Sequence, residues 1–197
     1  MTKSELRKKY KALRNAYTEQ QLDAFSIEIA NKTLELPVWN KSCFHLFLPI
    51  KTQNEVNTEY VLQILAGKDK DVVISKSNFE KIEMTHFLLT DNTKIVLNQY
   101  NIPEPVNGFE VSESKIDVVF IPLLAFDIKG NRVGYGKGFY DAFLTKCKPS
   151  TIKIGLSFFE AETIIKDNSP MDIPLDYCVT PEKVYLFKKL KTTNNAC

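Results

Sequence analysis

The stretch that most limits the possible folds is the most apolar run of the chain, residues 116–126 (IDVVFIPLLAF). Its hydrophobicity is continuous rather than alternating, which is typical of a strand that is covered on both faces. Pro122 must end or bulge this strand, because proline has no backbone N–H to donate to a neighbouring strand. Further strands are predicted at residues 43–48, 71–75, 82–89, 152–158, 176–180 and 184–187, with a possible edge strand at 93–97.

Helical patterns alternate with these strands. Thr18 and Gln21 have the spacing of a capping box, so a helix should begin there and continue to about Leu34. Other helices are predicted over residues 2–17, from an N-cap at Asn57 through Leu65, from Tyr140 to about Cys147, and over 160–165, with a loop at 101–108. This alternation indicates an α/β fold of three layers, α/β/α, with a mostly parallel central sheet and some antiparallel pairing at one edge.

Composition and length set the class of protein. At 197 residues the chain fits a single domain, which we expect to cover residues 1–197 with a frayed tail at 191–197. Four widely spaced cysteines, a polar beginning and no long apolar run favour a cytoplasmic protein with reduced thiols and no membrane span. The net charge of +2 is too small to indicate a nucleic-acid partner. We therefore expect a monomer that acts on small molecules.

A glycine-rich stretch, residues 127–141 (DIKGNRVGYGKGFYD), directly follows the apolar run. Glycine allows positive φ and close approach of the backbone to a ligand, and the amides at the start of the next helix favour an anion. Arg132 and Lys137 add positive charge, and Asp141 is a hard oxygen ligand suited to magnesium on a phosphate. The stretch is neither a Walker pattern nor G-x-G-x-x-G. A tight turn would explain some of its glycines but not the charged residues, so it predicts a phosphate cradle.

Three other features have two interpretations from the residues alone. The first helix carries a basic face at helical spacing, which is either solvated or reaches an anionic ligand with its first turn. Glu55, in a polar loop after a predicted strand, is either a solvated carboxylate or a ligand contact. His45 and His86 are expected to be packed, hydrogen-bonded core histidines. The basic face consists of Lys3, Arg7, Lys11 and Arg14.

The ordered motifs resemble those of the 5-formyltetrahydrofolate cyclo-ligase family. The central signature comprises Phe126-Asp127, Gly130-Asn131-Arg132, Gly134, Gly136-Lys137-Gly138 and Tyr140-Asp141. The likeness extends to a first helix that opens with Lys3 and Arg7, a Leu48-Pro49-Ile50 loop that leads to Glu55, and a closing Asp176 followed by Val179-Thr180. Phe139 stands where the family often has tyrosine and Asn57 where it often has aspartate, which puts a hydroxyl contact at position 139 in doubt.

The resemblance implies an α/β/α enzyme that converts 5-formyltetrahydrofolate to 5,10-methenyltetrahydrofolate while ATP, with Mg²⁺, becomes ADP and phosphate. Phosphorylation of the formyl oxygen would activate the carbon for attack by N10, which asks the protein for positioning and positive charge rather than for a general base. It implies that Arg132 and Lys137 act in catalysis and that Asp141 and Asp176 bind the metal. The implied ATP-binding residues are Lys3, Arg7, Arg132, Val133, Gly134, Tyr135, Gly136, Lys137, Gly138, Phe139 and Tyr140. The implied folate contacts are Ile50, Glu55, Tyr135, Phe139 and Tyr140.

Two alternatives from other classes compete with this enzyme. One is a nucleotide- or folate-binding module that retains the cradle without turnover. The other is an RNA-binding protein that uses the basic first helix, for which a steep salt dependence would be expected.

Overall fold

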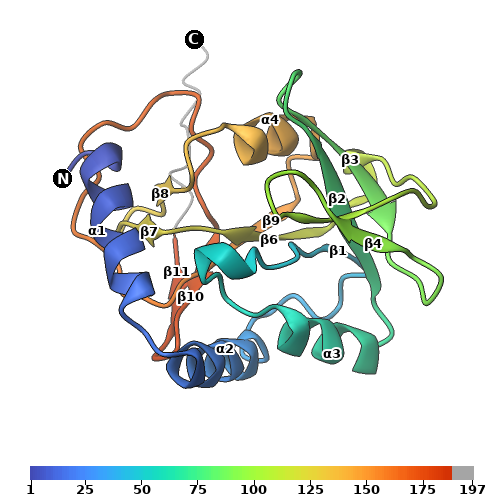
Figure 1. Cartoon of the computed structure of the whole chain (residues 1–197), viewed down its shortest axis with the longest axis horizontal. Coiled ribbons are helices and arrows are strands. Elements are labelled where there is room, and N and C mark those ends of the chain that lie inside the picture. The colour runs from blue at the N-terminus through green and yellow to red at the C-terminus, as the bar shows by residue number, and fades with distance from the viewer. Residues whose placement is uncertain (188–197) are drawn as a thin grey trace, which may run out of the picture.

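The computed structural model describes residues 1–187, so the predicted tail at 191–197 lies outside the described part of the chain. A sheet of seven strands forms its centre (Figure 1), in the order β11-β10-β9-β6-β1-β2-β3. The strands β10, β9, β6, β1 and β2 run parallel, while β3 and β11 pair antiparallel with the two ends of that row. The strands are β1 Cys43–His45, β2 Asp71–Asn78, β3 Glu83–Leu88, β6 Val118–Pro122, β9 Ile152–Leu156, β10 Tyr177–Val179 and β11 Val184–Leu186. The predicted mostly parallel α/β sheet is confirmed, with antiparallel pairing at both edges rather than one.

Helices cover both faces of the sheet (Figure 1). On one face, Ile29 and Val61 from α2 (Glu19–Thr33) and α3 (Glu59–Gly67) share a core with Phe120. On the other face, Phe143 of α4 (Phe139–Lys146) packs with Val119. The neighbouring residues 119 and 120 of β6 thus point to opposite cores, as the pleat requires. This two-sided burial explains the continuous hydrophobicity of the central strand.

The apolar run at 116–126 is divided, as the proline indicated. β6 ends at Pro122, and a short hairpin follows, formed by β7 (Ala125–Phe126) and β8 (Arg132–Val133). The buried carboxylate of Asp127 accepts backbone N–H bonds from Lys129, Asn131 and Ile165 at 2.9, 3.0 and 3.1 Å. This carboxylate therefore shapes the turn of the hairpin and ties it to a distant part of the chain.

The first helix, α1 (Lys3–Asn15), packs on that hairpin instead of on the main sheet. Its residues Leu6 and Tyr10 form a third buried cluster with Leu124 and Val133. The capping box predicted for α2, with Thr18 and Gln21, is present. Among the described residues, no helix is long and apolar enough to cross a membrane.

Three local predictions are wrong. Residues 160–165 form no helix, because the backbone of Glu162 pairs with Phe126 and Ile128 and draws this segment out beside the hairpin. α3 is capped at Thr58 rather than Asn57. The expected edge strand at 93–97 is reduced to β4 (Ile95–Leu97), which pairs with β5 (Pro103–Pro105), inside the expected loop, as a separate small sheet. The first and third outcomes share one cause, since long-range pairing overrides local propensity.

The two histidines are buried and hydrogen-bonded, as predicted. The Oγ atom of Ser75 lies 2.7 Å from Nε2 of His45 and 2.8 Å from Nδ1 of His86. Burial, chiefly, lowers the pKa of His86 from 6.5 to about 4. Burial and the neighbouring His86 lower the pKa of His45 as well.

These two lowered pKa values predict a loss of stability on mild acidification. The unfolded chain binds more protons than the folded one between pH 6.5 and about 4, so stability present above pH 6.5 is lost as the pH falls through this window. For a pKa shift of this size, we expect the free energy of unfolding to fall by about 2 to 3 kcal/mol, measured by urea denaturation. The variant His86→Asn should show a clearly smaller fall, and an equal fall in both proteins would contradict the assignment.

Candidate functional site

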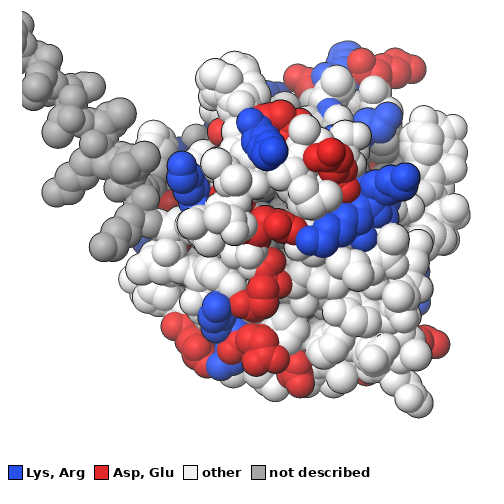
Figure 2. Space-filling model, turned by 90° about the vertical axis from the view of Figure 1, so that its left-hand side faces the viewer, with Lys and Arg blue, Asp and Glu red and all other residues white. Residues whose placement is uncertain are grey.

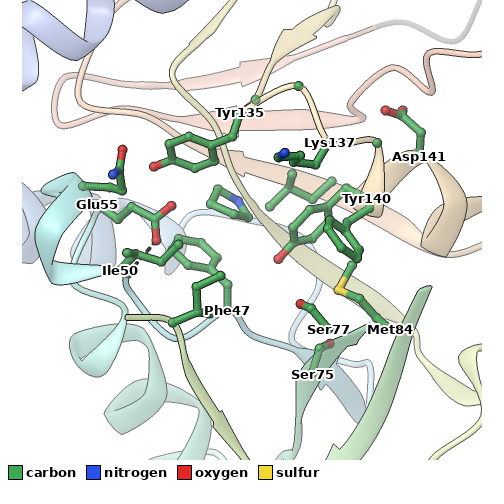
Figure 3. A pocket seen from close by; sticks show the side chains of 18 of the residues that line it. Phe47, Ile50, Glu55, Ser75, Ser77, Met84, Tyr135, Lys137, Tyr140 and Asp141 are labelled. Carbon is green, nitrogen blue, oxygen red and sulfur yellow. Dashed lines mark hydrogen bonds between the residues drawn. The ribbon is translucent and has the colours of Figure 1, made fainter. Parts of the chain in front are cut away.

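A pocket of about 720 Å³ opens at the carboxyl ends of β1 and β6. The strands β1 and β6 are neighbours in the sheet. After β1 the chain continues to β2 on one side of this pair, whereas after β6 it continues to β9 on the other side, so the loops that follow β1 and β6 diverge. Ligands of open parallel sheets bind at such a point, where the strand order reverses. The pocket is lined by residues from both loops, from α1, from the start of α4 and from β2 (Figure 3).

The glycine-rich loop forms one wall of this pocket. Gly136 has φ of +90°, and a Cβ there would lie 3.1 to 3.3 Å from the guanidinium of Arg7. Arg7 donates its Nε–H to the carbonyl oxygen of Gly134 at 2.9 Å, so α1 and the loop are held against each other. Gly138, at φ of +80°, is the N-cap of α4 and offers no side-chain acceptor to the amides of the first turn. These amides and the exposed Lys137 form a wall suited to an anion.

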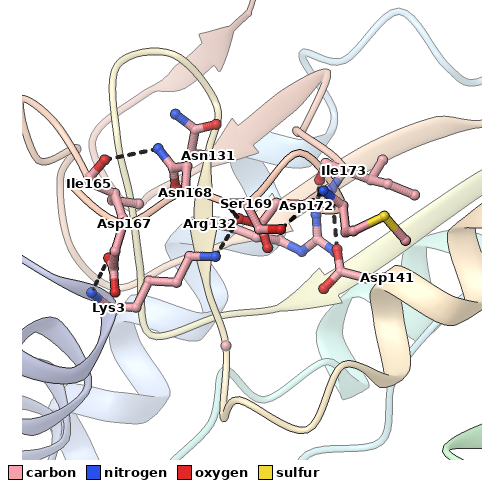
Figure 4. A network of polar contacts seen from close by, with 12 residues as sticks. Lys3, Asn131, Arg132, Asp141, Ile165, Asp167, Asn168, Ser169, Asp172 and Ile173 are labelled. Carbon is pink, nitrogen blue, oxygen red and sulfur yellow. Dashed lines mark hydrogen bonds and ion pairs between the residues drawn. The ribbon is translucent and has the colours of Figure 1, made fainter.

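The basic face of the first helix turns to the pocket, with Lys11 also exposed to solvent. Lys3, Arg7 and Lys11 line the cavity, and Arg14 is only 2% exposed. Lys3 is fixed at both ends, because its backbone N–H donates to Asp167 at 2.6 Å and its ammonium pairs with Asp172 (Figure 4). On the side of the molecule shown in Figure 2, acidic and basic side chains are interspersed rather than separated.

Arg132 and Asp141 form an ion pair beside this wall (Figure 4). The guanidinium donates to Oδ1 of Asp141 at 2.7 Å and also to the carbonyl oxygen of Ile173. The same carboxylate oxygen accepts the backbone N–H of Ile173 at 3.2 Å. Burial lowers the pKa of Arg132 although the charge of Asp141 acts to raise it. Arg132 is thus largely engaged with protein groups and holds Asp141 at the edge of the pocket.

The structure brings Asp141 together with Asp172 rather than with Asp176. Asp141 and Asp172 both line the pocket. Desolvation raises the pKa of Asp172, but contacts from Lys3, Ser169 and Arg132 outweigh it and the pKa is lowered, which keeps this group a carboxylate. Asp176 does not line the pocket and pairs with the ammonium of Lys153 at 2.6 Å. Sequence reasoning missed Asp172, whose loop has no local pattern that marks it.

Glu55 lies at the end of the pocket away from Lys137 and Asp141 (Figure 3). It is 8% exposed, and its Oε2 accepts the backbone N–H of Ile50 at 2.7 Å. Its Oε1 is buried without a hydrogen-bond partner among the described residues. Burial raises the pKa of this carboxyl, while Ile50, Tyr135 and Arg14 act to lower it. A buried oxygen without a partner is costly, so this one is suited to accept an N–H from a ligand.

Arg14 connects the two ends of the site and was not among the predicted site residues. It donates to the carbonyl oxygens of Leu123 at 2.7 Å and Gln53 at 3.3 Å, and to the hydroxyl of Tyr135 at 3.1 Å. Leu123 follows β6, Gln53 precedes Glu55, and Tyr135 is in the glycine-rich loop. One buried cation therefore sets the spacing between the walls. Its helical spacing with Lys3, Arg7 and Lys11 was the available signal.

The remaining predicted residues are nearly all in the pocket. Of the residues expected to bind ATP or folate, Val133 alone does not line it, because its side chain is buried against Leu6 and Tyr10. Phe139 stands where the family often has tyrosine. Its ring centroid lies 5.1 Å from that of Phe79, and the ring centroid of Phe79 lies 4.4 Å from that of Tyr100. These three rings form an aromatic cluster at the pocket that sequence reasoning did not anticipate beyond Phe139 itself.

The positive φ of Gly136 and its contact with Arg7 predict a sharp difference between neighbouring glycines. We expect Gly136→Ala to lower the free energy of unfolding by about 1 to 3 kcal/mol, because a Cβ is strained at this φ and must displace Arg7. Gly134→Ala is the matched control, since nothing lies within 4 Å of its Cβ position. Equal stability of the two variants in thermal or urea unfolding would contradict the predicted close approach.

Comparisons with known proteins place this geometry in a family. A model of the 5-formyltetrahydrofolate cyclo-ligase family matches residues 1–181. The probable 5-formyltetrahydrofolate cyclo-ligase of Schizosaccharomyces pombe is 29% identical over 83% of this chain and 87% of its own length. The mitochondrial 5-formyltetrahydrofolate cyclo-ligase of Arabidopsis thaliana is 30% identical over 93% of this chain and 74% of its own length.

Solved structures agree with these relatives. The NMR structure of the Aquifex aeolicus 5,10-methenyltetrahydrofolate synthetase superimposes with a TM-score of 0.81 at 27% identity and covers 100% of both chains. A 5,10-methenyltetrahydrofolate synthetase from Mycoplasma pneumoniae gives a TM-score of 0.72 at 25% identity, over 92% of this chain and 100% of that structure. The family resemblance seen in the sequence is confirmed: the chain belongs to the 5-formyltetrahydrofolate cyclo-ligase family.

Proposed function

We propose that this chain closes the ring of 5-formyltetrahydrofolate to give 5,10-methenyltetrahydrofolate while ATP becomes ADP and phosphate. Family membership supports the activity. One observation supports the assignment to this pocket: a single cavity joins the glycine-rich wall, which is suited to an anion, to the buried Oε1 of Glu55, which has no hydrogen-bond partner in the described part of the chain. A nucleotide triphosphate and a pterin need those two walls at once.

The folate occupies the end of the pocket at Glu55. A pterin carries neighbouring ring and exocyclic N–H groups, which match a buried carboxylate. The side chains of Phe47, Tyr135 and Tyr140 border the space in front of Glu55 (Figure 3), and their rings offer flat apolar surface to the pterin. Ile50 fixes the carboxylate through its backbone N–H and borders the same space.

The phosphates of ATP lie against the glycine-rich wall. The amides at the start of α4 and the side chains of Lys137 and Arg7 provide donors and positive charge for them. Among the described residues, Lys137 has no ion pair, so its ammonium is available to a phosphate without breaking a contact. Arg132 acts mainly by holding Asp141, which refines the catalytic role expected from the sequence.

Asp141 and Asp172 fit a magnesium ion that is shared with ATP. No group of three or more potential metal ligands occurs among the described residues. Mg²⁺ commonly takes only one or two carboxylates and completes its shell with phosphate oxygens and water. Bound there, Mg²⁺ would neutralise phosphate charge during transfer. We propose Asp172 in place of Asp176 as the second carboxylate, since Asp172 lies in the pocket.

The positions of these groups in the pocket fit a reaction of two steps, phosphoryl transfer and then ring closure. The N-formyl oxygen is a poor leaving group, so the γ-phosphoryl group is first transferred to it, which leaves an iminium-like carbon. N10 then attacks this carbon, and the oxygen departs as phosphate. Lys137 and Arg7 stabilise the charge that moves across the phosphoryl group, and the walls hold both substrates in line.

Two expectations from the sequence remain proposals. We propose a monomer in the cytoplasm, although one relative is named mitochondrial. A binding module without turnover is the alternative function, and it would bind ATP without releasing phosphate in the presence of folate.

Activity provides the direct test. Incubated with 5-formyltetrahydrofolate and Mg-ATP, the protein should form the methenyl product, followed by its near-ultraviolet absorbance. Lys137→Ala should lower kcat/KM by about 100-fold or more, the scale of losing a group that stabilises developing charge. The control is Lys129→Ala, an exposed lysine in the same glycine-rich segment that does not line the pocket, which should behave like wild type. Folded wild-type protein without product would overturn the proposed function, and equal rates in both variants would overturn the role of Lys137.

The choice between Asp172 and Asp176 is tested by the magnesium dependence. We expect the Mg²⁺ concentration for half-maximal rate to rise about tenfold or more in Asp141→Asn and Asp172→Asn, as for a loss of about 1.4 kcal/mol. Asp176→Asn should retain the wild-type value, even if the loss of its pair with Lys153 lowers stability. A shift in Asp141→Asn and Asp176→Asn, with the wild-type value in Asp172→Asn, would restore the pairing of Asp141 with Asp176.

A further inference from the structure

A hydrogen-bonded row of three side chains crosses the sheet beside the pocket. Ser75 of β2 stands between His45 of β1 and His86 of β3, with the two ring nitrogens 2.7 and 2.8 Å from its Oγ. Ser75 and His86 are register partners in the antiparallel pair of β2 and β3. The rings of Tyr140 and Phe143 pack against this row, with Phe143 only 4.1 Å from His86 between ring centroids. The mechanism above uses none of the three residues.

The row joins two cavities. His45 and Ser75 border the pocket that holds the candidate site. His86 borders a second cavity of about 350 Å³ that lies by the start of β3 and contains the carboxylates of Glu83, Glu110 and Glu113 together with Lys146. The outer ring nitrogens, Nδ1 of His45 and Nε2 of His86, have no hydrogen-bond partner among the described residues. A row of one hydroxyl and two imidazole groups has the donors and acceptors needed to pass a proton from the pocket to the second cavity.

Ring closure releases one proton that needs a path. When N10 attacks the activated carbon, the new N10–C bond leaves N10 with four substituents, a proton among them, and a positive charge. Phosphate departs with the electron pair of the C–O bond, and the N10 lone pair must be free to form the N5–C–N10 amidinium of the product. The N10–H bond therefore breaks, its electron pair stays on nitrogen, and the proton moves to an acceptor.

We propose that Ser75 and His86 carry this proton away from the site. Ser75 Oγ accepts the proton from N10 while its own proton passes to Nδ1 of His86, and His86 Nε2–H then releases a proton toward the carboxylates of the second cavity. His45 donates its Nε2–H to Ser75 Oγ and holds the hydroxyl in place. The proposal rests on the function proposed above, because it supplies the proton acceptor that the ring closure needs.

The surroundings of the two rings set the direction of transfer. If Ser75 donates to His86, the N–H without an observed hydrogen bond is Nε2–H of His86, a residue that borders the second cavity. The opposite arrangement places such an N–H on Nδ1 of His45, whose side chain is fully buried. The charge of Glu113 favours a protonated His86 and that of Lys146 opposes it, and further titratable groups that pack along this row are His45 and Tyr140. A positively charged N10 on a carbon with two other electronegative atoms is a strong acid, so even a buried imidazole is a sufficient acceptor.

Single-turnover kinetics tests the relay, because product release does not then limit the rate. With Mg-ATP and 5-formyltetrahydrofolate, we expect Ser75→Ala and His86→Asn each to slow methenyl formation by about 100-fold, as for loss of acid–base assistance. The KM values for both substrates should stay within about twofold of wild type. Ser77→Ala is the matched control, since Ser77 is on the same strand, lines the same pocket and contacts neither histidine by an observed bond. Its rate should equal that of wild type.

The outcomes separate the relay from a packing role and from the proposed function. A wild-type rate in folded Ser75→Ala overturns the relay, and so do equal losses in Ser75→Ala and Ser77→Ala. Absence of methenyl product with the wild-type protein overturns the proposed function instead. If a variant fails to fold, NMR of the wild-type protein labelled with ¹⁵N-histidine tests the direction of the relay instead. The chain has two histidines, so two sets of imidazole signals are expected. Near neutral pH we expect two neutral rings, both with Nε2 protonated, and Nδ1 protonation of His86 would overturn the proposed direction.

Discussion

The buried carboxylate of Asp127 is the contact on which the site depends. It shapes the turn between β7 and β8, from which the glycine-rich loop extends, and it accepts the backbone N–H of Ile165. The segment after Ile165 carries Asp167 and Asp172, which hold Lys3 at the start of α1 (Figure 4). One carboxylate thus aligns the loop, the segment that carries Asp172 and the first helix. Because several N–H bonds converge on a group without exposure to solvent, its removal would leave buried donors without partners.

Charges in the site are mostly balanced by protein groups before any ligand binds. Arg132 pairs with Asp141 and Lys3 pairs with Asp172, so each carboxylate has its own cation. Such pairs hold both carboxylates in place in a partly buried site. Among the described residues, Lys137, Arg7 and Lys11 line the pocket without an ion pair, so they provide the positive charge available to the proposed triphosphate. Positioning and charge stabilisation are thereby divided between different residues of the same wall.

Much of the fold was predictable because the signals are local. The capping box at Thr18, the stop at Pro122 and the two-sided burial of residues 118–121 follow from the chemistry of single residues and their neighbours. The helix expected at 160–165 failed because the backbone of Glu162 found partners near Phe126, more than thirty residues away. No local pattern records such a pairing.

In the candidate site, too, the features with local sequence signals were predicted and those that depend on long-range contacts were not. The spacing of glycines and basic residues in the glycine-rich loop and in the first helix indicated a site for an anion, and residues of both segments line the pocket. Asp172 could not be distinguished from Asp176 in the sequence, since only the path of the loop decides which carboxylate enters the pocket. In the sequence, Arg14 is distinguished only by its position on the basic face of the first helix. Its burial against Leu123 and Tyr135 depends on contacts between segments that lie far apart in the chain.

An isotope label tests most directly whether ATP activates the formyl oxygen in this pocket. With ¹⁸O in the formyl group of 5-formyltetrahydrofolate and Mg-ATP, the label should appear in the released inorganic phosphate, detected by mass spectrometry, in a one-to-one ratio with methenyl product. Label that appears in water, with unlabelled phosphate, would contradict phosphoryl transfer to that oxygen.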